Sequence, residues 1–330
     1  MVQSSSGSSS SSASAGNGIP VVDLSPFLTA ADETGKKKRK AMEAVKEACS
    51  EYGFFQIINH GVPTTLMDRA LQLSSTFFDF PDDEKRNFSA PPGAPLPAGY
   101  SRQPLHSPDK NEYLLMFPPS SPFNVSLTRP SELGDVAEEV FSCLSKTGSL
   151  IEGIINDCLG LPAGFLSEYN SDRNWDFMTA LRYFPATEEE DNGIAPHQDG
   201  NCVTFVFQDE AGGLEVCRNG VSWIPATPQP GAIVVNVGDV IQVLSNNKFK
   251  SATHRVIRPK GRSRYSYAFF YNLLGEKMVE PLLQFTEHLG ELPKYRKFQY
   301  GEYMQLRMRN KSHPPENPQD VIHITHYSIN

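Results

Sequence analysis

A histidine and an aspartate stand two residues apart in the segment APHQDG, which follows an acidic loop and precedes an apolar run. In an extended chain the side-chain period is two, so His197 and Asp199 project from one face and Gln198 from the other. Imidazole and carboxylate groups both bind metal ions, but one of each does not complete a site. The pair therefore predicts a metal centre only if a third ligand lies elsewhere in the chain.

The third ligand is expected in the β-rich second half of the chain, where His254 is the one histidine after His197 that lies in a strand-like run, HRVIRP. Two imidazoles and one carboxylate leave the opposite face of a metal open. A non-haem iron(II) oxygenase needs that open face for O₂ and a co-substrate. A zinc site and a hydrogen-bonded core histidine remain alternatives at this point.

An arginine and a serine follow His254 with the same two-residue spacing, so Arg264 and Ser266 also share one strand face. A buried guanidinium needs an anionic partner, and its planar fork matches a carboxylate. A dicarboxylate could bind the metal at one end and Arg264 at the other. The nearby Arg262 is expected on the surface.

Two kinds of element must position these side chains. Before residue 175, apolar residues at helical spacing predict helices over 35–53, 64–80 and 134–160, with strand-like pieces at 19–27 and 54–61. After residue 175, short β-rich runs are separated by Gly, Pro and Asn. These runs cover 177–184, 202–209, 214–219, 222–228, 232–238, 240–245, 254–259 and 264–273. Many short strands at such spacing indicate a sandwich or a barrel-like double sheet.

The composition limits the class of protein. The chain has 330 residues, 39% of them hydrophobic, and a formal net charge of −8, which suffices for a large core and argues against a nucleic-acid partner. Five cysteines without a CxxC spacing indicate reduced thiols, and no apolar run reaches the roughly 18 residues of a membrane span. We therefore expect a cytoplasmic protein that binds neither nucleic acid nor membrane. We also expect a monomer that acts on a small molecule.

In their order and spacing, these segments resemble a plant-type 2-oxoglutarate- and iron(II)-dependent dioxygenase of the isopenicillin-N-synthase-like superfamily. The resemblance covers residues 18–328 and rests on IPVVDLSPF, CSEYGFFQIINHGVP, HQDG, PGAIVVNVGDVIQVLSNNKFKSATHRV and RYSYAFFYN. It implies a mainly β fold with flanking helices, in which a distorted double-stranded β-helix, or jelly roll, occupies 175–330. A helical and mixed region over 18–174 wraps this core, and the serine-rich residues 1–17 are expected to be a disordered tail.

The resemblance also implies roles for individual residues. His197, Asp199 and His254 resemble the iron(II) ligands, and Arg264 and Ser266 resemble the residues that hold the far carboxylate of 2-oxoglutarate. No catalytic residue beyond the metal ligands is implied. The implied enzyme hydroxylates, desaturates or cyclises a small, largely hydrophobic plant specialised metabolite. It consumes O₂, releases succinate and CO₂, and uses ascorbate as reductant.

One segment departs from the family pattern. Many relatives read Asn-x-Tyr-Pro before the His-x-Asp loop, and the tyrosine hydroxyl contacts 2-oxoglutarate, whereas this chain reads Arg182-Tyr183-Phe184-Pro185. When Pro185 is aligned with the proline of the family pattern, Phe184 occupies the position of the tyrosine. We therefore expect the contact with 2-oxoglutarate to be absent and Tyr183 to lie on the other strand face. Arg182 shares a face with Phe184 and is the predicted replacement contact to the co-substrate, with contact to an acidic substrate and a structural salt bridge as the alternatives.

The family pattern places the substrate pocket on the strand after Ser266 and in the N-terminal region. The predicted pocket residues are Phe270, Asn272, Tyr113 and Phe117. Aromatic side chains suit a hydrophobic or partly aromatic small molecule. Two alternative functions remain: a non-haem iron oxidase of the same fold that uses no 2-oxoglutarate, and a catalytically silent small-molecule binding protein.

Overall fold

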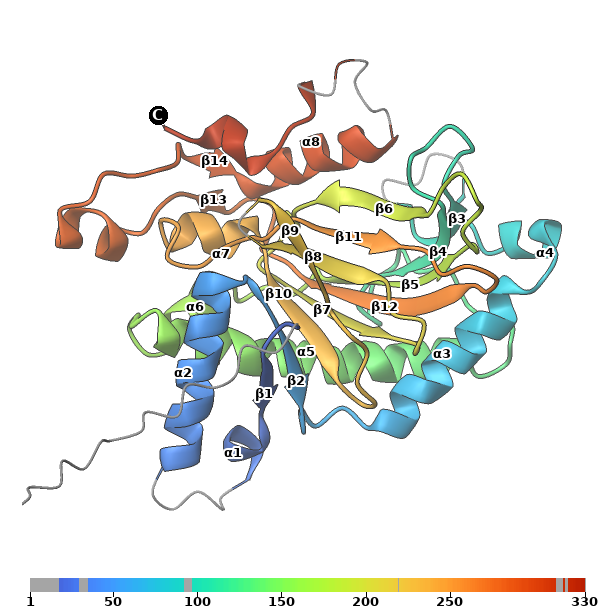
Figure 1. The fold of residues 1–330 in the computed structure, drawn as a ribbon, viewed down its shortest axis with the longest axis horizontal. Helices are drawn as coiled ribbons and strands as arrows, with labels where there is room; N and C mark the ends of the chain where they lie inside the picture. The colour runs from blue at the N-terminus through green and yellow to red at the C-terminus, as the bar shows by residue number, and fades with distance from the viewer. Residues whose placement is uncertain are drawn as a thin grey trace, which may run out of the picture.

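The computed structural model describes residues 18–29, 35–91, 97–218, 220–312, 317 and 320–329. The predicted tail over residues 1–17 lies outside these ranges. Two β-sheets face each other and form the core of the molecule, and helices surround it (Figure 1). The prediction of a mainly β, jelly-roll core with flanking helices is confirmed.

The large sheet has eight strands, of which only the pair β1 and β2 is parallel. In spatial order the strands are β1 (Val21–Asp23), β2 (Phe54–Ile58), β10 (Ile233–Val237), β7 (Val203–Gln208), β12 (Arg264–Tyr271), β5 (Phe177–Tyr183), β4 (Asn111–Met116) and β3 (Gly99–Arg102). The small sheet consists of β6 (Asn192–His197), β11 (His254–Ile257), β8 (Leu214–Arg218) and β9 (Ser222–Pro225).

Strand β12 shows how the sequence separates the two sides of the large sheet. Its alternate residues Tyr267 and Phe269 are completely buried in the core that the sheet shares with the helices. Ala268, between them, joins the smaller apolar cluster that lies between the two sheets. Since successive strand residues point to opposite faces, Arg264 and Ser266 also face the inter-sheet space. The site residues therefore lie inside the jelly roll.

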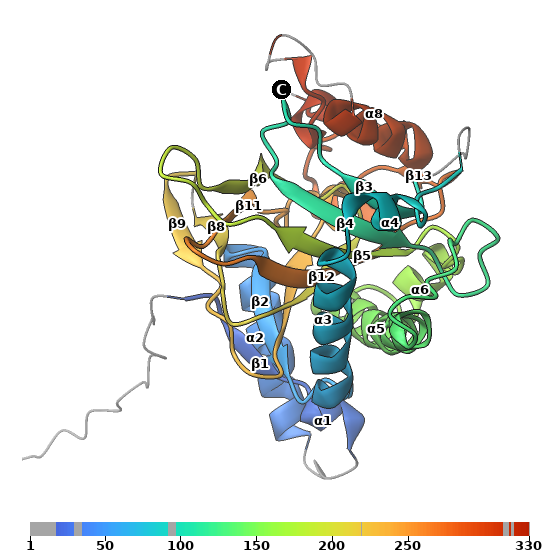
Figure 2. The same cartoon turned by 90° about the vertical axis from the view of Figure 1, so that its right-hand side faces the viewer.

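The helices cover the other face of the large sheet. Figure 2 shows α3 (Thr64–Phe78) beside α5 (Leu133–Cys158), and α2 (Lys36–Glu51) also packs on α5. These bounds agree closely with the predicted helices, because each presents a regular apolar stripe to one core. Shorter helices are α1 (Ser25–Leu28), α4 (Asp82–Arg86) and α6 (Phe165–Tyr169).

The strand predicted over 240–245 is wrong. This segment forms α7 (Asp239–Leu244), in which Val240, Ile241, Val243 and Leu244 are buried. A short apolar run is compatible with either a buried strand or a buried helix turn. Here the apolar residues also have helical spacing, and the side chain of Gln242, between them, bonds Tyr295 and the backbone of Ser251.

The C-terminal segment lies at the end of the molecule where α7 lies, and it is red in Figure 1. It contains β13 (Met278–Val279), β14 (Phe298–Gln299), α8 (Tyr300–Ser312) and the 3₁₀ turns η1 (Leu283–Phe285), η2 (Glu287–Leu289) and η4 (Ile324–Tyr327). Tyr327 of η4 packs on Phe298 and Tyr303, which holds this turn against α8.

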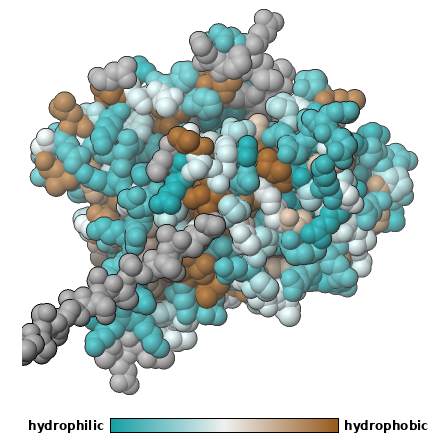
Figure 3. Space-filling view, viewed as in Figure 1, coloured by the Kyte–Doolittle hydropathy of each residue, from teal (hydrophilic) through white to brown (hydrophobic). Residues whose placement is uncertain are grey.

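Strands from before and after residue 175 share the large sheet, because β2 pairs with β10 and β4 pairs with β5. The boundary near residue 175 therefore stays a prediction as a division between domains. Within the described ranges, no helix combines the length and the apolar character that a bilayer span requires. The face shown in Figure 3 is largely hydrophilic, with small, separated hydrophobic areas.

Candidate active site

Three potential metal ligands come together inside the jelly roll. His197 ends β6 and His254 begins β11, and the two residues are directly opposite each other in the small sheet. Asp199 lies in the loop that follows β6. One ligand atom from each residue lies within 4.8 Å of the other two. The structure thus brings together the three side chains singled out in the sequence.

Backbone carbonyls orient both imidazole rings. Nδ1 of His197 lies 2.8 Å from the carbonyl oxygen of Ala195, and Nδ1 of His254 lies 3.2 Å from that of Ala252. A carbonyl only accepts, so each Nδ1 carries the proton and each Nε2 offers a lone pair. The Nε2 atoms lie 3.6 and 3.7 Å from Oδ1 of Asp199, too far for hydrogen bonds.

Asp199 is held by two side chains from neighbouring strands. Thr204 Oγ1 and Asn236 Nδ2 donate to its Oδ2 over 2.7 and 2.8 Å, so Oδ1 faces the histidines. Burial acts to raise the pKa of this carboxyl, but His254, His197 and the two hydrogen bonds outweigh it and hold the pKa well below its usual value. One carboxylate and two imidazoles fit the donor set of a non-haem iron(II) site.

A buried cation lies on β12, in the same inter-sheet space. This cation is Arg264, which is only 1% exposed. It donates to the Gly212 carbonyl over 2.5 Å, to Ser266 Oγ over 3.1 Å and to Gln208 Oε1 over 2.7 Å. Among the described residues, no carboxylate forms an ion pair with it. A buried guanidinium whose hydrogen-bond partners are all neutral is suited to an anionic ligand.

Tyr183, not Phe184, faces this cation. Tyr183 pairs directly with Arg264 across β5 and β12, and the guanidinium lies 4.6 Å from the centre of its ring. Burial raises the pKa of the Tyr183 hydroxyl, while Arg264 and a hydrogen bond with Ser266 act to lower it. The expectation that Tyr183 points away from the site is wrong, because β5 continues through Tyr183 and sets the register there.

Arg182 lies on the opposite face of the sheet, opposite Tyr265. Its guanidinium donates to the carbonyl of Phe78 over 2.7 Å and lies 3.4 Å from the buried Glu112 carboxylate. The predicted contact of Arg182 with the co-substrate is therefore wrong, and the structural salt bridge is present. Phe184 lies beneath Arg102, 4.6 Å from ring centre to guanidinium.

The predicted pocket residues separate into two groups. Phe270 is half-buried on the Arg264 face of β12 and stacks on Phe177 of β5, with ring centres 4.5 Å apart. Tyr113 of β4 is half-buried on the same face, and these residues are available to a ligand. Asn272 is buried, and its amide accepts from Tyr300 Oη and donates to the Phe270 carbonyl. The Asn272 amide therefore already forms hydrogen bonds within the protein on both its oxygen and its nitrogen.

The fourth predicted pocket residue, Phe117, is buried just beyond the end of β4. The side chain of Asn124 accepts from the backbone N–H of Phe117 over 2.8 Å and donates to its carbonyl over 3.1 Å. These bonds fix the backbone there and leave the proposed contact between Phe117 and substrate a prediction.

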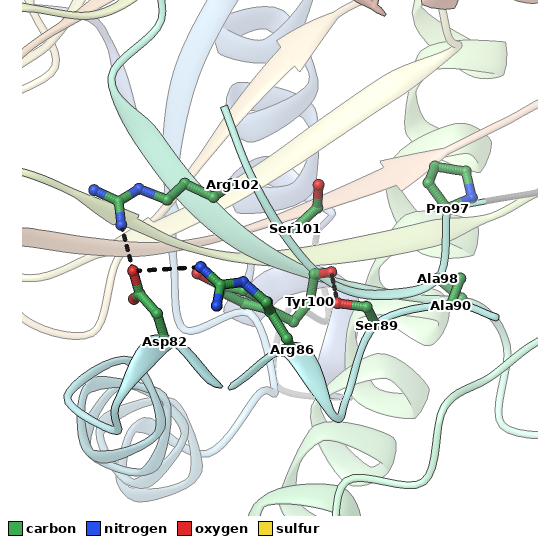
Figure 4. Close-up of a pocket in the computed structure, with 9 residues that line it drawn as sticks. All are labelled: Asp82, Arg86, Ser89, Ala90, Pro97, Ala98, Tyr100, Ser101 and Arg102. Carbon is green, nitrogen blue, oxygen red and sulfur yellow. Dashed lines mark hydrogen bonds and ion pairs between the residues drawn. The ribbon is translucent and has the colours of Figure 1, made fainter. Parts of the chain in front are cut away.

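A separate hollow of about 420 Å³ lies between α4 and the edge strand β3 (Figure 4). Arg102 and Arg86 both approach Asp82 in this hollow, at 3.0 and 4.0 Å. The hollow is lined by Asp82, Arg86, Ser89, Ala90, Pro97, Ala98, Tyr100, Ser101 and Arg102. It contains none of the three potential metal ligands, and its two arginines already share a carboxylate.

Sequence reasoning missed four polar residues of the site. They are Thr204, Asn236, Gln208 and Tyr183. Thr204 and Gln208 occur in one strand and Asn236 in another, at alternate positions that face the inter-sheet space. A polar residue at an otherwise apolar, inward-facing strand position is the signal that could have identified them.

Known proteins resemble this chain over nearly its full length. The sequence profile of the 2OG-Fe(II) oxygenase superfamily matches residues 175–273, and that of the N-terminal region of non-haem dioxygenases in morphine synthesis matches residues 19–130. The chain is 32% identical to 1-aminocyclopropane-1-carboxylate oxidase 5 of Arabidopsis thaliana, over 90% of this chain and 96% of that protein. It is 30% identical to flavonol synthase/flavanone 3-hydroxylase of the same plant, over 86% and 84% of the two chains.

A solved structure supports the same relationship. JOX2 in complex with 2OG, Fe and JA superimposes with a TM-score of 0.80 at 28% identity, covering 94% of this chain and 89% of that chain. The sequence matches, this similarity and the His-Asp-His cluster are mutually consistent. The chain therefore belongs to the 2OG-Fe(II) oxygenase superfamily and is a 2-oxoglutarate/Fe(II)-dependent dioxygenase.

Proposed function

We propose that His197, Asp199 and His254 hold the Fe(II) ion and that Arg264 and Ser266 bind the distal carboxylate of 2-oxoglutarate. Iron and 2-oxoglutarate, when bound, supply the activation of O₂ for oxidising a C–H bond, with succinate and CO₂ as co-products. The observation that carries the proposal is the buried Arg264, whose hydrogen-bond partners are neutral and which faces the same inter-sheet space as the three ligands.

The residues of the chain have binding and orienting roles in this proposal. Thr204 and Asn236 fix Asp199 so that one carboxylate oxygen is directed at the histidines. Such outer hydrogen bonds orient ligands and keep them basic. Gln208 and the Gly212 carbonyl orient the guanidinium of Arg264, whose remaining N–H groups can donate to a carboxylate in a bidentate manner.

We further propose that the oxidised substrate is a small, largely hydrophobic plant metabolite. Support comes from the stacked pair of Phe270 and Phe177 and from Tyr113, all half-buried on the face that carries Arg264. Aromatic faces bind flat, apolar molecules well. Relatives at 30–31% identity are named for flavonoid and gibberellin oxidation, which is consistent with a substrate of this class.

A substrate screen with a co-substrate readout tests the proposal. The purified chain is incubated with plant metabolite fractions, Fe²⁺, ascorbate and 2-oxoglutarate labelled at the carboxylate that is lost as CO₂. We expect labelled CO₂ together with a product that has gained one oxygen atom, or has lost two hydrogen atoms if the outcome is desaturation or ring closure. An oxidised product without labelled CO₂ would favour the oxidase that uses no 2-oxoglutarate. Neither signal in any fraction would favour a silent binding protein.

A further inference from the structure

The C-terminal helix α8 contacts the loop that carries the potential metal ligands. Arg307 of α8 donates from Nη2 to the backbone carbonyl of Gln198, the residue between His197 and Asp199. The side chain of Gln198 points elsewhere and donates to the Ser251 carbonyl over 2.5 Å. The peptide between the two ligands is therefore held from two sides, once by its own residue and once by a helix more than a hundred residues later in the chain.

Close packing accompanies this hydrogen bond. A Cβ atom added to Gly200 would lie 3.0 Å from Met304 Sδ and 3.4 Å from the Tyr303 ring, so the loop approaches α8 closely at its glycine. Tyr303 Oη donates to Oδ2 of the buried Asp239 over 2.6 Å. The backbone N–H of Asp239 in turn donates to the carbonyl of Asp199 over 2.8 Å. Two connections thus run from α8 to the ligand loop.

Arg307 is half-buried and also contacts the segment that follows α8. Its Nη1 lies 3.4 Å from Nδ1 of His323 and 3.5 Å from the carbonyl of Ile322. Burial raises the pKa of the Asp239 carboxyl, and the nearby guanidinium of Arg307 acts to lower it. One guanidinium therefore joins the ligand loop, the helix and the C-terminal turn.

We propose that Arg307 is a positioning residue for the metal site: its hydrogen bond to the Gln198 carbonyl fixes the peptide between two ligands and couples their geometry to α8. This inference rests on the proposed metal ligands. A residue that orients a ligand from outside the metal sphere changes metal affinity, typically by about 10- to 100-fold, without itself touching the metal. Arg307 is placed to act in this way through the backbone.

The coupling must also operate in the opposite direction. If docking of α8 strengthens metal binding, metal binding must strengthen the docking of α8 by the same free energy. Backbone amides of α8 should then exchange their hydrogens more slowly in the metal-bound protein, because opening of the helix away from the loop becomes less frequent. A helix that serves only as a cover would show no such response.

The first experiment compares three variants of the full chain after removal of metal with a chelator, using Co²⁺ as the probe. Arg307→Met keeps the aliphatic stem and removes the donor, and it should weaken Co²⁺ binding by about 10- to 100-fold. Arg307→Lys restores a donor and should recover most of the affinity. Arg309→Met, an exposed position on the same helix, makes the same change of charge and should leave the affinity unchanged. The Co²⁺ absorption spectrum, which reports ligand geometry, should change in Arg307→Met alone.

The second experiment measures hydrogen exchange in the wild-type chain, so it does not depend on the folding of a variant. Addition of Co²⁺ should slow exchange in α8 more than in α2, which packs elsewhere. Equal Co²⁺ affinity and spectra for Arg307→Met and Arg309→Met, or unchanged exchange in wild-type α8, would overturn the positioning role. Undiminished Co²⁺ binding by Asp199→Ala would instead overturn the metal-site assignment on which the role depends.

Discussion

Replacing Arg264 removes the charge that we assign to the distal carboxylate of 2-oxoglutarate. Arg264→Leu places an apolar side chain at a position that is 1% exposed, and it removes all five N–H donors of the guanidinium. Three donations, to Gly212, Ser266 and Gln208, are made within the protein, and Tyr183 also lies against the guanidinium, so its hydrogen-bond partners in the protein are neutral. The substitution therefore removes the desolvated ion pair that we propose between Arg264 and the co-substrate.

The size of the effect follows from that pair. Removing one partner of a buried, hydrogen-bonded charge pair costs about 2–5 kcal/mol. At about 1.4 kcal/mol for each tenfold change, the Kd for 2-oxoglutarate should rise by at least about thirtyfold, and by several thousandfold at the upper end. Metal affinity should change little, because Arg264 makes no hydrogen bond to any of the three proposed ligands.

Isothermal titration of 2-oxoglutarate into the Mn²⁺-loaded protein measures this Kd without turnover. The matched control is Arg262→Leu in the same segment, where an exposed arginine pairs with Glu210 at 2.7 Å and the expected change is negligible. An Arg264→Leu variant that folds, binds Mn²⁺ and keeps the wild-type Kd for 2-oxoglutarate would refute the reasoning.

Three further changes have defined outcomes. Asn236→Ala removes one of the two hydrogen bonds to Asp199 Oδ2 and should lower Co²⁺ affinity by about 10- to 100-fold in a titration. Tyr183→Phe should weaken 2-oxoglutarate binding by about 1 kcal/mol in calorimetry, whereas Phe184→Tyr should have no effect because Phe184 lies beneath Arg102. Glu112→Ala removes the buried carboxylate that Lys85 and Arg182 share, leaving them the more exposed Asp82 and Asp79, and should lower the free energy of unfolding in urea by about 3–5 kcal/mol.

Each of these predictions has its own contradicting result. An Asn236→Ala variant with wild-type Co²⁺ affinity would show that Thr204 alone orients the carboxylate. A gain in 2-oxoglutarate affinity for Phe184→Tyr would mean that the register of β5 is wrong. For Glu112, the control is Glu132→Ala, which breaks an exposed pair with Arg69 and should cost less than about 1 kcal/mol. Equal losses in the free energy of unfolding for Glu112→Ala and Glu132→Ala would contradict the claim that burial makes the Glu112 pairs more stabilising.

Much of the site could be predicted because its residues repeat at the strand period. His197 and Asp199, and then Arg264 and Ser266, each occur two positions apart, and such spacing places side chains on one face whatever the partner strand is. His254 required only that its own run be recognised as a strand. The sequence could not show that His254 lies directly opposite His197, since that depends on pairing between distant segments.

The errors near residue 183 have a physical cause. Counting back from Pro185 assigned the face of Arg182 and Phe184 to the site. These two residues do lie on one side, with the guanidinium 5.6 Å from the ring centre, but the pairing of Tyr183 with Arg264 places Tyr183 on the site face instead. A shift of one residue exchanges the two faces of a strand. Glu112, which pairs with Arg182, lies in a different strand, so the local sequence around Arg182 does not predict this contact.

The remaining errors and omissions also depend on long-range contacts. Asn272 follows the pocket-facing residues in register, but the hydroxyl of Tyr300, at the start of α8, binds its amide. The run at 240–245 has the composition of a strand and becomes helical where Asp239 bonds back to the backbone of Asp199. Such contacts appear only when the C-terminal segment is placed against the core.

Formation of succinate from 2-oxoglutarate by the Fe²⁺-reconstituted protein tests the central claim most directly. It is measured for the wild type, for Asp199→Ala and for the exposed control Asp191→Ala. The assay contains O₂, ascorbate and plant metabolite extract. We expect iron- and O₂-dependent succinate from the wild type and from Asp191→Ala. Asp199→Ala should yield none, although its metal-free form should still unfold cooperatively on heating. Succinate formation by Asp199→Ala at the wild-type rate would contradict the account.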